Sequence, residues 1–239
     1  MPPGYPEALG RLETPRPSGR GQFRLNLPLI ASSLQQVQAD FDRINRTLSA
    51  PRDPMTDEVR ENMLAGYRCV DDALAQGLDL FALGNSRRLL ELNILVLCGT
   101  QGAQREECEK HVPLVEQRFY EQEGGGIGDL MEWLGRHKGD SVWARAAGAY
   151  IHVLSQPQLF IEGNHRAGAL IMSFILAREG KPPFVLSVAN AKAYFDPSSL
   201  AKGTKRKSVG MLIRLPKLKK RFAKLLKEGA DKRYLLPAD

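Results

Sequence analysis

The chain has 239 residues, of which 43% are hydrophobic and 26% charged, and its formal net charge is +7. That length is enough for one large domain or two small ones with a buried core. The sequence contains no run of eighteen apolar residues, and its first residues lack the apolar segment of a secretory signal, so we expect a cytoplasmic protein without membrane contact.

The positive charge is concentrated near the C-terminal end. Residues 201–239 contain thirteen Lys or Arg against three Asp or Glu, a surplus of ten, which leaves 7 − 10 = −3 for the first 200 residues. We therefore expect residues 201–239 to form a basic helical tail, for which nucleic acid is a candidate partner. The three cysteines form no C-x-x-C motif, and this spacing predicts reduced thiols instead of disulfides or metal ligands.

The first half of the chain alternates between loop-like and helical patterns. Residues 1–28 contain six prolines and four glycines, which predicts a flexible arm. A helix is predicted from near Ser33 until the proline-containing "SAPRDP". A second should begin after Thr56, whose hydroxyl can cap it, and end by Gly77. A third follows Asn85 and is apolar on nearly all sides, which is typical of a central, buried helix.

The second half begins with a long connection after residue 98, "GTQGAQREECEKHVPLVEQRFYEQEGGG", where the helical periodicity fails. Helical spacing returns in four segments, which are "IGDLMEWLGRHKG", the residues after Asp140, residues 165–178 and "PKLKKRFAKLLKEG". The predicted fold class is therefore all-α, with a helical domain over residues 29–200 and at most a small hairpin in the long connection.

Polar side chains gather in "FIEGNHR", directly before one predicted buried helix. A helix N-terminus attracts anions, Gly163 permits close backbone approach, and Asn164 and Arg166 offer hydrogen-bond donors. Glu162 would repel a bare phosphate unless Mg²⁺ bridged the two, so these residues indicate a phosphate and magnesium site. The alternative is a solvent-facing loop in which Glu162 pairs with Arg166 while Asn164 caps the helix.

This segment resembles the signature of the Fic (Fido) family, which runs His-Pro-Phe, two residues of which the second is acidic, Gly-Asn-Gly-Arg, and often a further Arg three residues on. The preceding "IGDLMEWLGRHKGDSVWARAAGAYIHVL" is similar to the helical pair that leads into that signature. The resemblance covers residues 85–180, with the signature at 156–169. It implies a Fic-like helical bundle with a small β-hairpin flap that docks a protein target. It also implies transfer of a nucleoside monophosphate, usually AMP from ATP, to a protein hydroxyl.

The resemblance also assigns roles to the residues of the loop. Glu162 would hold Mg²⁺, Gly163 and Asn164 would form the phosphate-binding turn, and Arg166 would grip the phosphates of the nucleotide. His165 stands where the family has a glycine, and we expect it to donate to phosphate.

The position of the family's catalytic base differs from the family pattern. Counting back from Arg166 places Gln158 there, whereas aligning the proline places Gln156 there. Neither carboxamide accepts a proton near neutral pH, so the general base is missing. Ala169 replaces the second arginine, and His152, on the preceding helix, would point away from the family position.

Three functions remain open from the sequence. The first is a Fic-like enzyme with weak or altered transfer activity, and the second is an inactive Fic-shaped module that binds a nucleotide or a protein. The third is association of the basic tail with nucleic acid.

Overall fold

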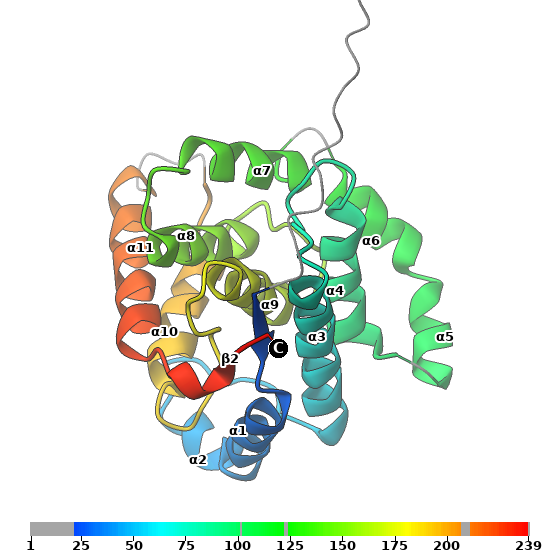
Figure 1. Ribbon diagram of the computed structural model, residues 1–239, viewed down its shortest axis with the longest axis vertical. Helices are drawn as coiled ribbons and strands as arrows, with labels where there is room; N and C mark the ends of the chain where they lie inside the picture. Colours follow the sequence, from blue (N-terminus) through cyan, green and yellow to red (C-terminus); the bar gives the residue numbers. More distant parts are fainter. Residues whose placement is uncertain (1–21, 101, 122–123, 207–210, 239) are drawn as a thin grey trace, which may run out of the picture.

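The structure, a computed structural model, describes residues 22–100, 102–121, 124–206 and 211–238 (Figure 1). Within these ranges the chain is mostly helical, with one two-stranded antiparallel sheet. The elements in chain order are β1 (Phe23–Leu25), α1 (Leu27–Ala39), α2 (Phe41–Asn45), α3 (Asp57–Ala75), α4 (Ser86–Cys98), α5 (Ala103–Glu109), α6 (Val112–Phe119), α7 (Ile127–Arg136), α8 (Val142–Leu154), α9 (Asn164–Ala177), α10 (Ala191–Lys202), α11 (Met211–Glu228), a 3₁₀ turn η1 (Lys232–Tyr234) and β2 (Leu235–Pro237).

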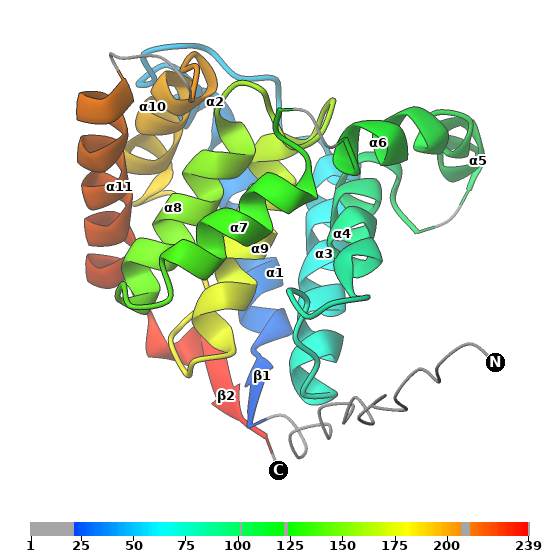
Figure 2. The ribbon, with the colours of Figure 1, turned by 90° about the horizontal axis from the view of Figure 1, so that it is seen from above.

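Helix α9 is the central element, with α3, α4 and α8 packed against it (Figures 1 and 2). Its residues from Ala167 to Ala177 are all buried. Two glycines allow the close packing. A Cβ on Gly168 would lie 2.9 Å from Cδ2 of Tyr150 in α8, and a Cβ on Gly66 of α3 would lie 2.2 Å from Cδ1 of Leu170. Helix α9 therefore cannot shift without disturbing the core, and its first turn is held in a fixed place.

The helices predicted from capping residues and apolar spacing are confirmed, except that the first begins at Leu27 and not near Ser33 and is divided into α1 and α2 at Asp40. Thr56 Oγ1 accepts a hydrogen bond from Val59 N–H at 3.2 Å at the start of α3, and Gly77 follows the end of α3 with φ of +62°. The buried helix after Asn85 is α4, and the C-terminal basic helix is α11. None of the helices in the described ranges is both long and apolar enough to cross a bilayer.

The end of the predicted arm is ordered. Residues 1–21 lie outside the described part, but the strand Phe23–Leu25 and the start of α1 fall within the segment 1–28. Pro28 stands in the first turn of α1, where its missing N–H would have no intrahelical partner anyway. Asp71 fixes the strand, because its carboxylate accepts hydrogen bonds from Leu25 N–H at 2.7 Å and from the Arg24 guanidinium.

The predicted hairpin flap in the long connection is wrong for the residues that the structure describes there. They form α5 and α6, and the only sheet in the described ranges pairs β1 with β2, with Phe23 opposite Pro237. The valines of the connection belong to α6, where they follow helical spacing and not strand alternation.

The prediction of reduced cysteines is also wrong for two of the three. Cys98 at the end of α4 forms a disulfide with Cys108 in α5, while Cys69 is free. Because α5 folds back beside the end of α4, the two Cα atoms come within 5.6 Å, which suits a disulfide.

Candidate functional site

The loop between α8 and α9 carries the residues that resemble the family signature. Helix α8 ends at Leu154, the Gln156–Pro157 peptide is cis, and α9 begins at Asn164 after Gly163, whose φ is +70°. The loop therefore reverses the chain in nine residues between two buried helices.

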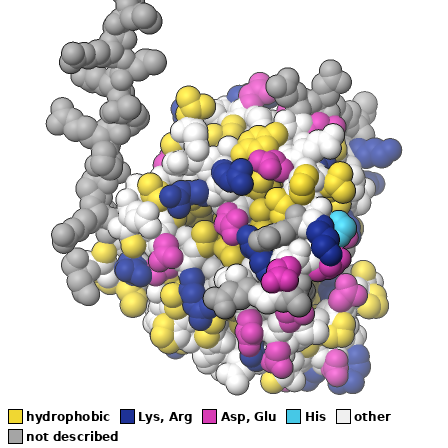
Figure 3. Space-filling view, turned by 90° about the vertical axis from the view of Figure 1, so that its right-hand side faces the viewer, with side chains coloured by type: hydrophobic (Ala, Val, Ile, Leu, Met, Phe, Trp, Pro, Cys, Tyr) yellow, Lys and Arg dark blue, Asp and Glu magenta, His cyan; other side chains and the backbone are white. Residues whose placement is uncertain are grey.

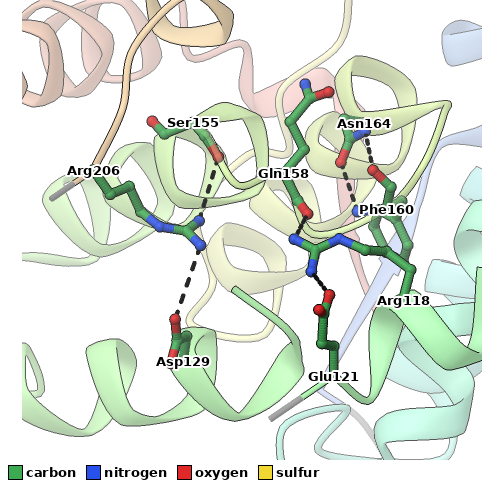
Figure 4. A network of polar contacts seen from close by, with 8 residues as sticks. All are labelled: Arg118, Glu121, Asp129, Ser155, Gln158, Phe160, Asn164 and Arg206. Atoms are coloured by element: carbon green, nitrogen blue, oxygen red, sulfur yellow. Dashed lines mark hydrogen bonds and ion pairs between the residues drawn. The ribbon is translucent and has the colours of Figure 1, made fainter. Parts of the chain in front are cut away.

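Two arginines from other elements hold the loop (Figure 4). The Arg118 guanidinium donates to the carbonyl of Gln158 and pairs with Glu121. Arg206 donates through Nη1 to the carbonyls of His152 at 2.6 Å and Ser155 at 3.4 Å, which fixes the end of α8. Arg118 is 40 residues away from Gln158 in the sequence, so local pattern gave no sign of this contact.

The side chain of Asn164 closes the loop on itself. Its Oδ1 accepts a hydrogen bond from Phe160 N–H at 2.9 Å, and its Nδ2 donates to Phe160 O at 2.8 Å (Figure 4). Asn164 is only 4% exposed. Its amide therefore builds the turn and is not free to bind a ligand, and it does not cap α9 as the solvent-facing alternative required.

Gly163 is required by helix α4. A Cβ at this position would lie 2.8 Å from Nδ2 of Asn93 and 3.1 Å from Cγ of Leu97, in addition to the strain of its positive φ. Asn93 Nδ2 also donates to the carbonyl of Glu162 at 2.9 Å. The close backbone approach expected at Gly163 is thus an approach to α4, while the Glu162 side chain is exposed.

Arg166 is directed toward the end of α4, where its Nη1 donates to the carbonyl of Val96. Burial lowers the pKa of this guanidinium, and the carboxylates of Glu162 and Glu58 oppose that shift through their charges. No ion pair joins Arg166 to Glu162 in the part of the chain that is described, so the pairing required by the solvent-facing alternative is not seen.

His165 faces the opposite side of α9. Its Nδ1 lies 3.3 Å from the Tyr150 hydroxyl and its Nε2 lies 3.4 Å from Nη1 of Arg52. Burial lowers the pKa of His165 to about 3, and the positive charge of Arg52 acts in the same direction. The imidazole is therefore neutral near pH 7 and lies between Tyr150 and Arg52.

A cavity of about 580 Å³ lies against the loop. Gln156 and Gln158, the two candidates for the base position, both line it, and Gln158 Nε2 donates to Leu154 O at 3.2 Å. The remaining lining residues of the cavity in the described part are Pro157, Phe160, Arg118, Glu121 and Gly124.

The sequence therefore pointed to the residues on one side of this cavity, Gln156 and Gln158, but not to those on the other side, Arg118 and Glu121. Of the predicted site residues, only the two glutamines reach it. Arg118 and Glu121 were missed because they belong to the connection whose structure could not be predicted. Both residues lie in the string "RFYEQ", but nothing in that string indicates that they contact the loop between α8 and α9.

The first backbone amides of α9 have no partners. Ala167 N–H bonds to Gly163 O, but within the described residues the N–H groups of Asn164, His165 and Arg166 receive no acceptor. The first turn of α9 also contains no acidic residue. These three donors and the positive end of a fourteen-residue helix provide the charge that an anion needs.

The residues present fit Mg²⁺ only together with a phosphate ligand. Among the described residues no three His, Cys, Asp or Glu side chains are grouped so that they could hold a metal ion. Glu162 supplies one exposed carboxylate, and Mg²⁺ is commonly bound by one or two carboxylates together with phosphate oxygens and water.

Comparison with known proteins leaves the family open. No protein-family model matches the chain, and neither a curated protein nor a solved structure matches it. The resemblance to the Fic family therefore depends on the signature residues and the helices around them.

Proposed function

We propose that the loop between α8 and α9 binds a phosphate-bearing ligand, and that a nucleotide such as ATP with Mg²⁺ is the class it takes. The observation that carries this proposal is the set of three unpartnered amides at the start of a fixed, buried helix, which follows a loop whose first half lines a cavity of about 580 Å³. A cavity of that size is within the range that holds small-molecule ligands.

In this proposal the chain is a Fic-like binding module that transfers little or nothing. Neither residue at the base position accepts a proton near neutral pH, because both candidates are glutamines, and the carboxylate of Glu121 on the cavity wall pairs with Arg118. His165 cannot replace the base from where it lies, since its imidazole faces Tyr150 and Arg52.

Isothermal titration of the full chain with a nonhydrolysable ATP analogue and Mg²⁺ tests the proposal. Gln158→Glu adds a negative charge to the cavity wall and should weaken binding by about tenfold or more, which corresponds to about 1.4 kcal/mol. Gln22→Glu makes the same change at an exposed position of the chain and should leave the affinity unchanged. Absence of binding by the wild-type chain, or an equal loss in both variants, would contradict the proposal.

The second candidate is nucleotidyl transfer to a protein hydroxyl, with AMP from ATP as the group transferred. The set Glu162, Gly163, Asn164 and Arg166 favours it, and positioning of a nucleotide can support some catalysis without a base. In this function a protein target would dock beside residues 118–126.

Labelled ATP, Mg²⁺ and a cell lysate distinguish transfer from binding. Gln158→His or Gln156→His should create a labelled protein band that the wild-type chain does not produce, by supplying the missing base, which is worth about a hundredfold or more. If both variants bind the ATP analogue and neither labels a protein, transfer is excluded and the binding module remains.

The other expectations concern location and a further partner. We propose a cytoplasmic protein on the sequence alone, although the Cys98–Cys108 disulfide would be unusual there, because cytosolic thiols are kept reduced. Nucleic acid, the remaining partner expected from the sequence, would contact a different surface, on helix α11.

A further inference from the structure

Helix α11 is an amphipathic helix, and the apolar side of its described part, from Arg214 onward, packs into the fold. It packs against α8 and α10 and lies at the outer edge of the molecule (Figures 1 and 2). Leu218, Phe222 and Leu226 are buried, and the Phe222 ring meets the Tyr150 ring edge-on with centroids 5.0 Å apart. The basic segment is therefore a fixed surface of the domain and not a free tail.

The opposite side of α11 presents a single row of cations. At 100° per residue its exposed Lys and Arg fall within an arc of about 140°, and they extend over about 20 Å along the helix axis. These residues are Arg214, Lys217, Lys220, Arg221, Lys224 and Lys227.

Almost nothing in the described chain neutralises this row. Lys224 is 3.8 Å from Glu228, but both side chains are about two-thirds exposed, and pairs of that kind contribute little. The other five have no hydrogen bond or ion pair to any residue that the structure describes. The face formed by α3 to α6 is different, because basic and acidic side chains alternate over it (Figure 3).

We propose that this cationic face of α11 binds duplex nucleic acid through its phosphates. The proposal goes beyond the nucleotide site and does not depend on it. A line of like charges about 20 Å long attracts a polyanion, and the phosphates of duplex nucleic acid carry the opposite charge at high density.

Two other occupants fit the face less well. An amphipathic helix binds a membrane by inserting its apolar side, and Leu218, Phe222 and Leu226 on that side of α11 are buried against the fold. The fully buried centre of a protein interface is apolar, and between Arg214 and the end of α11 the structure has no large exposed hydrophobic residue.

The chemistry of the face also favours duplex over single-stranded nucleic acid. Single strands are bound largely by stacking their bases on aromatic side chains. The aromatic ring of α11, Phe222, is completely buried, so it cannot stack on a base. We therefore expect an affinity that depends on the charge of the nucleic acid and not on its base sequence.

Fluorescence anisotropy of the full chain with labelled 20-base-pair duplexes of two unrelated sequences tests the proposal. The wild-type chain should bind both equally, and its affinity should fall steeply between 50 and 200 mM salt. The variant Lys217→Gln, Lys220→Gln, Lys224→Gln keeps good helix formers on the face and should weaken binding at least about tenfold. It should also reduce the slope of log K against log salt by about 2 to 3, because each lost phosphate contact removes about 0.9.

A matched variant controls for net charge. Lys110→Gln, Lys138→Gln, Lys181→Gln removes three exposed lysines from other elements and should leave binding unchanged. Equal losses in the two variants, binding that is independent of salt, or no binding at 50 mM salt would overturn the proposal. The proposal would also be overturned if the chain bound phosphatidylserine vesicles or a single strand more tightly than the duplex, and if the α11 variant lost that binding.

Discussion

Replacing Asn164 by alanine gives the sharpest test of how the loop is built. The side chain is 4% exposed and makes two hydrogen bonds, to the N–H and to the C=O of Phe160. Alanine removes both partners and leaves a buried donor and a buried acceptor without replacement. Each unsatisfied group costs about 1–3 kcal/mol, so we expect the free energy of unfolding to fall by about 2–6 kcal/mol.

Urea denaturation at pH 7, followed by circular dichroism, measures this loss. Asn190→Ala is the matched control, because Asn190 makes the same kind of pair, donating to Val185 O at 2.8 Å and accepting from Ser187 N–H at 2.9 Å. Both variants should therefore be less stable than the wild type.

Only the Asn164 variant should also lose the ligand. Without the two Asn164–Phe160 hydrogen bonds, which we call the clamp, the segment from Phe160 to Asn164 is free to move. The amides at the start of α9 then lose their fixed surroundings, so binding of the ATP analogue should weaken at least about tenfold. A stability change below about 0.5 kcal/mol would refute the argument for the clamp, since two buried bonds cannot be lost so cheaply. If the Asn164 variant is less stable but binds the ATP analogue as tightly as the wild type, the clamp is supported and the proposed site is contradicted.

Two further predictions concern packing and protonation. Gly148→Ala should lower the free energy of unfolding by about 1–3 kcal/mol, because the new Cβ would lie 2.1 Å from Cη2 of Trp133. Gly135→Ala should raise the free energy of unfolding by up to about 1 kcal/mol, because its new Cβ would meet nothing within 4 Å. Urea denaturation measures both changes. Burial lowers the pKa of both His152 and His165 from 6.5 to about 3, so between those values the unfolded chain binds more protons and stability should fall with falling pH. From pH 7 to pH 5 the loss of stability should be about 2 kcal/mol per histidine. A double variant with glutamine at both positions should lose most of this dependence of stability on pH. An unchanged dependence would show that neither histidine is buried as described.

The sequence predicted those elements whose signals are local. Helix α3 carries its own start and stop, in the Thr56 cap and in Gly77, and α9 was found from its continuous apolar residues. The sheet could not be predicted, because Phe23 pairs with Pro237 across nearly the whole chain and each strand has only three residues. Helix α10 was missed for a local reason, since Pro197 and two serines interrupt its pattern although the fold tolerates them.

In the structure, side chains of the candidate loop make other contacts than the sequence indicated. Sequence reasoning treated Asn164 and Arg166 as groups that face a ligand. In the structure Asn164 binds Phe160, and Arg166 binds the carbonyl of Val96. The Arg166 contact depends on where α4 lies, which a pattern of seven residues does not contain. The Asn164 contact lies within those seven residues, and there the side chain bonds to the backbone of its own loop and not to a ligand.

The distribution of these side chains has a consequence for what the loop can do. Its polar groups are committed to three different neighbours, Asn164 to the loop itself, Arg166 to α4, and His165 to Tyr150 of α8. What remains free for a ligand is the main-chain N–H at the start of α9, which no substitution except proline removes, and the exposed carboxylate of Glu162. A site made of main-chain donors on a rigid helix recognises charge and shape without supplying a proton acceptor. Such a site can hold a phosphate firmly, and any transfer of that phosphate must obtain its base from elsewhere, as the histidine variants at position 156 or 158 would test.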